Sequence, residues 1–243
     1  MSFRGIIESV NGARRTLSLV NVDAPPDVTA AVADYVDPLQ VRLVRDRTES
    51  GQPTNAALFH ADGDFLAASP LRTVYRHVDV ERGLHTATDL ESFSYPAVLA
   101  GIDDTTFSEF GKRRMIVASR EIEKRAWDAD AGALHVGFQR LSLLADQRRI
   151  YRKLGDSGVD THVYGEPDAS APADVPVAVH PSDDPEIRDC WFVVFDGAGA
   201  ADRKAALLAE DLAPNRYSGF WTHRSELVDR VLEHLQAEHL PAG

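Results

Sequence analysis

The segment that most constrains the fold is the run at residues 190–196 (CWFVVFD), which is almost entirely strand-forming. The loop Gly197-Ala198-Gly199 follows, and a second apolar run then occupies residues 205–212 (AALLAEDL). Helix propensity alone would allow a helix over this second run. Its place directly after a hydrophobic strand and a glycine-rich loop favours a strand instead, so the pair predicts an antiparallel hairpin inside a sheet.

Hydrophobic periodicity and turn signals predict further elements along the whole chain. Strands are expected at residues 15–23, 40–47, 56–60, 64–68, 159–165, 175–180 and 217–221. Helices are expected at about residues 3–10, after a cap at Asp27, at about 106–127 and 139–154, and from about residue 225. The apolar stripe of the helix at 106–127 includes Ser119, with Arg and Glu on its other side, and the stripe of the helix at 139–154 includes Leu144, Tyr151 and Leu154. The expected fold is therefore α/β, of the α+β kind, with a mostly antiparallel central sheet flanked by helices.

The order of these elements predicts a division of the chain. Residues 1–80 form a small N-terminal α/β unit, residues 81–104 a connecting segment, and residues 105–243 a larger C-terminal domain. Residues 58–69 (LFHADGDFLAAS) and 193–211 (VVFDGAGAADRKAALLAED) both place an Asp-Gly turn before an alanine-rich return strand. This pattern fits either two similar α/β units or the general frequency of Asp-Gly hairpins.

The charge composition points to a salt-rich environment. The chain of 243 residues has 25 Asp and 13 Glu against 22 Arg and only 4 Lys, for a formal net charge of −12. Short carboxylates retain water in concentrated salt, where screening weakens their mutual repulsion. Long lysine stems would add apolar surface that strong salt drives to associate. The composition is typical of the cytoplasm of extreme halophiles, the alternative being an acidic protein from an arginine-favouring genome.

The same composition argues against several kinds of partner. Binding to nucleic acid or to an anionic membrane surface needs a basic face, which this charge balance disfavours. No apolar run approaches the length of about 20 residues that a membrane span needs, and no signal peptide is expected, so we expect a cytoplasmic protein. Cys190 stands alone. His234 and His239 are five residues apart on one expected helix, which is off-face for a metal pair, so no metal site is predicted.

Motifs for catalysis are lacking in the sequence. It contains no Walker A motif, no G-x-G-x-x-G and no H-E-x-x-H, and its carboxylates are numerous enough for pairs to arise by chance. We therefore expect a protein that is not an enzyme, and the sequence leaves any cofactor undetermined.

Several segments, taken in order, carry a family resemblance. Residues 119–123 (SREIE) lie on one expected helix and residues 137–139 (GFQ) open the next, with residues 163–165 (VYG) at the end of a later strand. The hairpin at 190–212 follows, and residues 216–222 (RYSGFWT) precede the last helix. This ordered set resembles the DICT sensory domain, which is found with diguanylate cyclases and two-component proteins. The likeness covers a little over half of the chain and is strongest to stand-alone haloarchaeal members, whereas residues 1–80 resemble only the N-terminal region of those members.

The resemblance implies a non-catalytic sensing or regulatory module of a haloarchaeal signalling system. Such a module would act through a partner protein or by self-association. A small-molecule ligand is compatible with this role, but the family implies no particular one. Two other functions stay open at this point, a protein-interaction adaptor without a ligand and an unrecognised enzyme.

A ligand pocket of a sensor is expected between the predicted helix at 139–154 and the C-terminal sheet. Aromatic side chains near strand ends, together with glutamine and arginine on that helix, suit an apolar pocket with a few polar groups. The candidate ligand-binding residues are Phe138, Gln139, Gln147, Arg148, Tyr151, Trp191, Phe220 and Trp221. The alternative is that the aromatic residues belong to the core and Arg148 to the surface.

Overall fold

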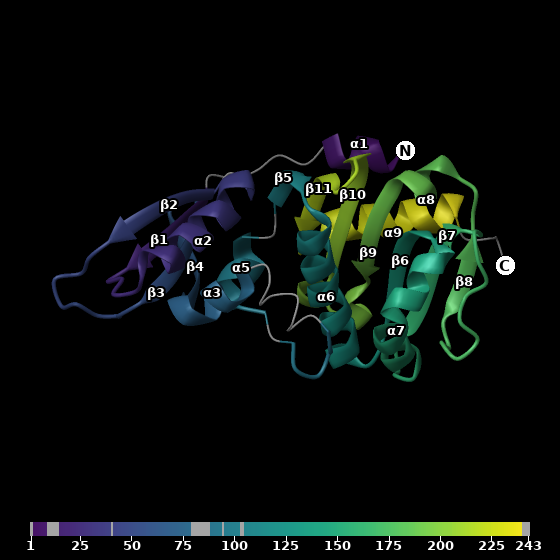
Figure 1. Cartoon of the computed structure of the whole chain (residues 1–243), viewed down its shortest axis with the longest axis horizontal. Helices are drawn as coiled ribbons and strands as arrows, with labels where there is room; N and C mark the ends of the chain where they lie inside the picture. The colour runs from purple at the N-terminus through teal and green to yellow at the C-terminus, as the bar shows by residue number, and fades with distance from the viewer. Residues whose placement is uncertain are drawn as a thin grey trace.

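The chain folds around two β-sheets with helices packed against them, in the α/β class that the sequence predicts (Figure 1). The structure, a computed structural model, describes residues 2–8, 15–39, 41–78, 88–93, 95–102 and 105–239. No helix in these ranges is both long and apolar enough to cross a membrane.

The first sheet has four strands in the order β2-β1-β3-β4. Its strands are β1 (Arg15–Val20), β2 (Val41–Asp46), β3 (Ala56–Ala61) and β4 (Asp64–Pro70). The parallel pair β1 and β2 is connected through the helix α2 (Pro26–Val36) and the short 3-10 helix η1 (Asp37–Leu39), and β3 and β4 form an antiparallel hairpin. Apolar side chains of β1 and β3 pack with α2 and with the helices α3 (Leu71–Val78) and α5 (Ala97–Ile102).

The second sheet has seven strands in the order β5-β11-β10-β9-β6-β7-β8. Its strands are β5 (Thr105–Phe110), β6 (Ala133–Arg140), β7 (Asp160–Glu166), β8 (Ala178–Pro181), β9 (Cys190–Phe195), β10 (Ala205–Ala213) and β11 (Arg216–Thr222). Among the strand pairings of the described residues in this sheet, only those of β6 with β7 and of β7 with β8 are parallel, so the prediction of a mostly antiparallel sheet is confirmed.

The central strand β9 shows how the seven-stranded sheet is covered on both faces. Val193 and Phe195 belong to the core under the long helix α6 (Lys112–Ala129), and Phe192 and Val194 to the core under the opposite layer. A strand buried on both faces needs a continuous apolar run, which is what the sequence has here. The opposite layer consists of α1 (Phe3–Glu8), α8 (Pro185–Asp189) and α9 (Ser225–Glu238), and α9 crosses the strands behind the sheet in Figure 1.

The two sheets share one continuous core. That core joins Phe59 of the first sheet to Trp221 of the second, and Arg114 of α6 donates a hydrogen bond to the carbonyl oxygen of Tyr35 in α2 at 2.7 Å. The helix α1 belongs to the first eighty residues, yet its Phe3 packs under the seven-stranded sheet. The division into 1–80, 81–104 and 105–243 stays a prediction.

The helices predicted at 106–127 and 139–154 are wrong in their bounds. The strand β5 occupies 105–110 and α6 starts at Lys112, after Gly111 in an extended conformation. The second region begins at the end of β6 and continues as the 3-10 helix η2 (Leu141–Gln147) before the short helix α7 (Arg148–Gly155). Leu144, Tyr151 and Leu154 are nevertheless buried as predicted, because both helix types turn these residues toward the sheet.

Two smaller predictions also fail. Asp27 is not the cap of α2, since Pro25 holds that position without a side-chain hydrogen bond and Asp27 lies within the first turn. Charged residues of α6 were expected on its solvent side, but Arg120, Glu121 and Glu123 are buried. The expectations for Val10, Gln40 and parts of the connecting segment (79–87, 94, 103–104) lie outside the described residues.

Candidate functional site

A narrow cavity of about 60 Å³ lies between α6 and the strands β6 and β9, with η2 and α7 along its side. We call it the α6 cavity. Five of the eight predicted ligand-binding residues line it, namely Phe138, Gln139, Gln147, Tyr151 and Trp191. The remaining lining residues are Lys112, Ile116, Ser119, Arg120, Glu123, Val136, Gly137, Leu143, Asp146 and Val193.

Aromatic rings form much of the cavity wall. Phe138 meets Tyr151 edge to face, with ring centroids 5.0 Å apart. Trp191 is half-buried, and its indole Nε1–H donates a hydrogen bond to Ser119 Oγ at 2.9 Å, which holds the ring against α6. On the opposite face of the sheet, Gly137 leaves room for the ring of Phe192, since a Cβ at that position would lie 2.2 Å from it. The cavity wall itself is mostly apolar.

A buried polar network crosses the base of this wall. The Arg120 guanidinium forms an ion pair with Glu123, and its second terminal nitrogen donates to Gln147 Oε1 at 2.8 Å. Tyr151 donates its hydroxyl proton to Glu123 Oε1 at 2.5 Å. Both charged residues are only 3% exposed, so each depends on the other for compensation.

Burial determines the protonation properties of this network. It raises the pKa of the Glu123 carboxyl, against the opposing effects of the Arg120 guanidinium and the Tyr151 hydroxyl. Burial, together with the neighbouring Glu123, also raises the pKa of Tyr151 well above its usual range. Tyr151 is therefore a permanent hydrogen-bond donor at ordinary pH, which fixes the orientation of the Glu123 carboxylate.

The other three predicted residues lie elsewhere. The Arg148 side chain is 58% exposed and pairs with Asp174, with Nε donating to Oδ2 at 2.8 Å. Phe220 is fully buried on the α9 face of the sheet, and Trp221 packs near Tyr95 with ring centroids 5.5 Å apart. These positions correct the expectation of one shared pocket, because β11 is separated from the cavity by β10 and successive side chains of β11 point to opposite faces.

The sequence pattern does not identify Ser119, Arg120 and Glu123 as site residues. Ser119 lies on the apolar stripe predicted for the long helix, and Glu123 follows it by four residues, on the same face. A carboxylate at that spacing inside a buried stripe was a detectable signal of a buried polar network. What the spacing did not reveal was the partner, since Gln147 and Tyr151 come from a different element.

The fold and the cavity define an α/β domain with an aromatic-walled pocket and a buried polar network beside it. Residues 98–212 match the model of the DICT family, described as a sensory domain in diguanylate cyclases and two-component systems. The match runs from α5 to β10 and includes all residues of the α6 cavity, so this part of the chain is similar to that family.

Two further comparisons gave less. No curated protein matches the chain. Among solved structures, the polyphosphate kinase of Porphyromonas gingivalis resembles this one with a TM-score of 0.38 and 11% sequence identity. The likeness covers 96% of this chain and 47% of that one, so this chain spans about half the length of the kinase, and no property of the kinase is transferred.

Proposed function

We propose that this protein is a non-catalytic sensor whose α6 cavity binds a small, partly aromatic or apolar molecule. The single observation that supports this most is the buried Arg120–Glu123–Tyr151 network on the wall of a mostly apolar cavity. Binding pockets of this kind use apolar walls for affinity and a few fixed polar groups for orientation. The DICT family, whose model residues 98–212 match, is described as a sensory domain, which agrees with this use of the cavity.

The finer parts of the proposal rest on composition and on the family. We place the protein in the cytoplasm of a halophilic archaeon, because Asp outnumbers Glu and only four lysines are present. We also propose residues 105–243 as the sensory domain, with the four-stranded unit before it. Ligand binding would change the association of this protein with a partner protein in a signalling pathway, or the association between copies of the chain. Neither a nucleic acid nor a membrane would take part.

A thermal-shift screen of cell metabolites tests the ligand part of this proposal. A molecule that binds only the native protein raises the thermal midpoint, by an amount that grows with the logarithm of its concentration above Kd. The blocking variant is Ile116→Trp, which enlarges a half-buried side chain on the cavity wall. The matched control is Val117→Trp, one residue further along α6 and outside the lining of that cavity.

The expected result is a metabolite that raises the midpoint of the wild type and of Val117→Trp but not of Ile116→Trp. A metabolite that stabilises all three proteins equally would locate binding elsewhere. If no metabolite shifts the wild type, the ligand-free adaptor becomes the better account.

One observation favours that adaptor role as the second candidate. Phe65 and Leu66 on the edge strand β4 are 60% and 55% exposed. Exposed apolar side chains on an unpaired strand edge favour association, and concentrated salt strengthens the tendency. Under the adaptor hypothesis, Phe65→Ser with Leu66→Ser abolishes association measured by light scattering in molar KCl, while no metabolite affects it.

A further inference from the structure

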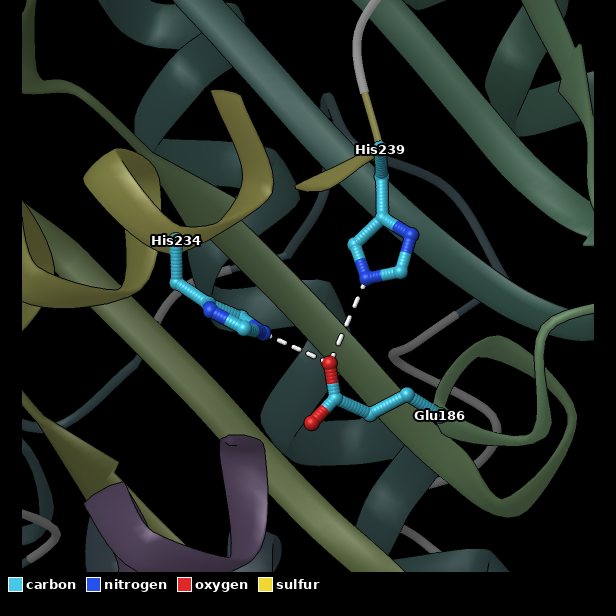
Figure 2. A group of neighbouring side chains, drawn as sticks. All are labelled: Glu186, His234 and His239. Atoms are coloured by element: carbon cyan, nitrogen blue, oxygen red, sulfur yellow. Dashed lines mark hydrogen bonds and ion pairs between the residues drawn. The ribbon is translucent and has the colours of Figure 1, made fainter. Parts of the chain in front are cut away.

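Two histidines and a glutamate converge on the face of the seven-stranded sheet opposite the α6 cavity (Figure 2). His234 Nε2 lies 2.5 Å from Glu186 Oε2, and His239 Nε2 lies 3.3 Å from the same oxygen. One ligand atom from each residue falls within 4.8 Å of the others. Outside the α6 cavity, this is the group among the described residues that best matches a set of metal ligands.

The convergence depends on where the last helix ends. His234 lies on α9, but α9 ends at Glu238, and His239 follows it with a φ of −123°. The change in backbone direction carries the His239 ring back toward Glu186, as the close view shows. The five-residue spacing that argued against a metal pair assumed one continuous helix, and that assumption is wrong for His239.

The carboxylate is held in place by a further contact. Its other oxygen, Oε1, accepts a hydrogen bond from the backbone N–H of Phe3 at 2.7 Å. The Phe3 ring lies edge-on to His234, with centroids 4.9 Å apart. A metal ligand oriented by a second hydrogen bond from the surrounding protein is the usual arrangement in metal sites.

From these contacts we propose that Glu186, His234 and His239 bind a divalent transition-metal ion, with Zn²⁺ as the best match. Two imidazoles and one carboxylate are a donor set that suits Zn²⁺. Tetrahedral Zn²⁺ with bonds of about 2.0–2.2 Å places its ligand atoms roughly 3.3–3.5 Å apart. The distance from His239 to Glu186 already has this value, and the His234 ring must withdraw from Glu186 by less than about 1 Å. The three ligand atoms, which lie within 4.8 Å of one another, must also close to this spacing around the ion.

The surroundings allow an ion to enter. The three residues line a hollow together with Asp184, Pro185 and Glu238. The carboxylates of Asp184 and Glu238 add negative charge at the rim. Three protein ligands leave one position of a tetrahedral ion for water or for an exogenous ligand. Because Glu186 is tied to Phe3, the bound ion would connect the α1, α8 and α9 segments of the fold.

Equilibrium dialysis of the full chain against Zn²⁺ in molar KCl, followed by metal analysis, tests the site. The expected result is one Zn²⁺ per chain, with affinity reduced by at least about 100-fold in Glu186→Gln and in His239→Gln. The control is His60→Gln, which removes a histidine of the first sheet and should keep wild-type affinity. Co²⁺ provides an independent readout, since a four-coordinate site absorbs visible light far more strongly than the hydrated ion.

The variants must be compared at equal folding, so their thermal midpoints are measured first in the presence of a chelator. Glu186→Gln keeps an acceptor for the Phe3 N–H and tests the ligand even if His239→Gln unfolds. Zn²⁺ binding that is unchanged in Glu186→Gln, or lost equally in His60→Gln, would overturn the proposal. Absence of bound Zn²⁺ in the folded wild type would do so too, leaving a histidine–carboxylate hydrogen-bonded group only.

Discussion

At the scale of single residues, the buried charges of the α6 cavity are the most demanding feature of this protein. Arg120 and Glu123 lie on the same face of α6 and are both removed from water. A buried ion pair adds little net stability, but the loss of one partner leaves an uncompensated charge that is expensive to keep buried. Because the pair adds little net stability, we infer that its role is to fix the positions of the polar groups beside the cavity.

Replacing Glu123 by leucine should therefore destabilise the protein by about 3–5 kcal/mol, because the Arg120 charge loses its partner. Replacing both residues, Arg120→Met with Glu123→Leu, should cost much less than the single change. Urea unfolding in molar KCl measures the free energies of unfolding of Glu123→Leu, of Arg120→Met and of the double variant. A double variant that is as unstable as the sum of the two single variants would show that the pair is not energetically coupled.

A second residue-scale feature is a row of aromatic and imidazole rings across β6, β7 and β8. His135 is buried, its Nδ1 lies 2.9 Å from the Tyr164 hydroxyl oxygen, and its ring stacks on His162 at 4.7 Å. Burial and the neighbouring His162 lower the pKa of His135 to about 4. The imidazole is thus neutral in the folded protein down to mildly acidic pH.

The sign of the resulting pH dependence follows from proton uptake. In the unfolded chain His135 has an ordinary pKa of about 6.5, so between pH 6.5 and 4 the unfolded state binds the extra proton. The stability due to a neutral His135 is present above pH 6.5 and is lost as pH falls toward 4. The total loss is about 3 kcal/mol at most. In His135→Gln the free energy of unfolding should fall less steeply across this range than in the wild type or in His60→Gln. Equal slopes in all three proteins would rule out His135 as the titrating group.

At the scale of secondary-structure elements, the two sheets repeat one connection pattern. In the first, β1 and β2 are parallel, β3 pairs antiparallel with β1, and β4 pairs with β3. In the second, β6 and β7 are parallel, β9 pairs antiparallel with β6, and β10 pairs with β9. The two Asp-Gly hairpins compared in the sequence occupy equivalent places in this pattern, which supports the hypothesis of two similar α/β units.

Local signals predicted the hairpins and the last helix well, because their turns and stripes are complete within a short segment. Asp62-Gly63 lies between β3 and β4, and the apolar stripe from Leu227 to Leu235 is buried in α9. The strand β6 and the strand β5 were missed. The β6 sequence ALHVGFQR includes a buried histidine and a glycine whose roles depend on Tyr164 and Phe192, which are far along the chain. The cavity was therefore only partly predictable, since α6 supplies groups whose partners come from other elements.

The hairpin turn between β3 and β4 gives a prediction at this scale. Asp62 and Gly63 have positive φ values of 51° and 95°, which the two-residue turn requires. Gly63→Ala should lower the free energy of unfolding by about 1 kcal/mol or more, because an L side chain is strained at this φ. Gly5→Ala in α1 is the control and should be neutral or stabilising by about 0.5–1 kcal/mol. A stable Gly63→Ala protein would indicate a different turn in solution.

At the scale of the whole molecule, the charge of −12 acts against compactness at low ionic strength. The 38 acidic residues outnumber the 26 basic residues that could form ion pairs with them, so many carboxylates have no basic partner available. Salt that shortens the screening length from about 10 Å to about 3 Å removes most of the remaining repulsion. The scarcity of lysine limits the apolar surface that such salt would drive together.

The thermal midpoint should therefore rise continuously as KCl increases from about 0.1 M to about 3 M. Part of this rise is common to all proteins, because concentrated salt strengthens apolar burial. A variant with several exposed Asp residues changed to Asn separates the two effects, since it should gain less from the first molar of KCl. A wild-type midpoint that does not change with salt would contradict the halophile interpretation of the composition.

The central claim, that the α6 cavity binds a signal molecule, is tested most directly on the three tryptophan indoles. Trp191 lines the cavity with its Nε1–H bonded to Ser119, whereas Trp127 and Trp221 lie outside that lining. Nuclear magnetic resonance spectra of protein with ¹⁵N-labelled tryptophan show one indole signal for each. We predict that at least one pool of small metabolites shifts the Trp191 signal and leaves those of Trp127 and Trp221 in place. Pools that leave Trp191 unmoved throughout, or that shift only Trp127 or Trp221, would contradict the account.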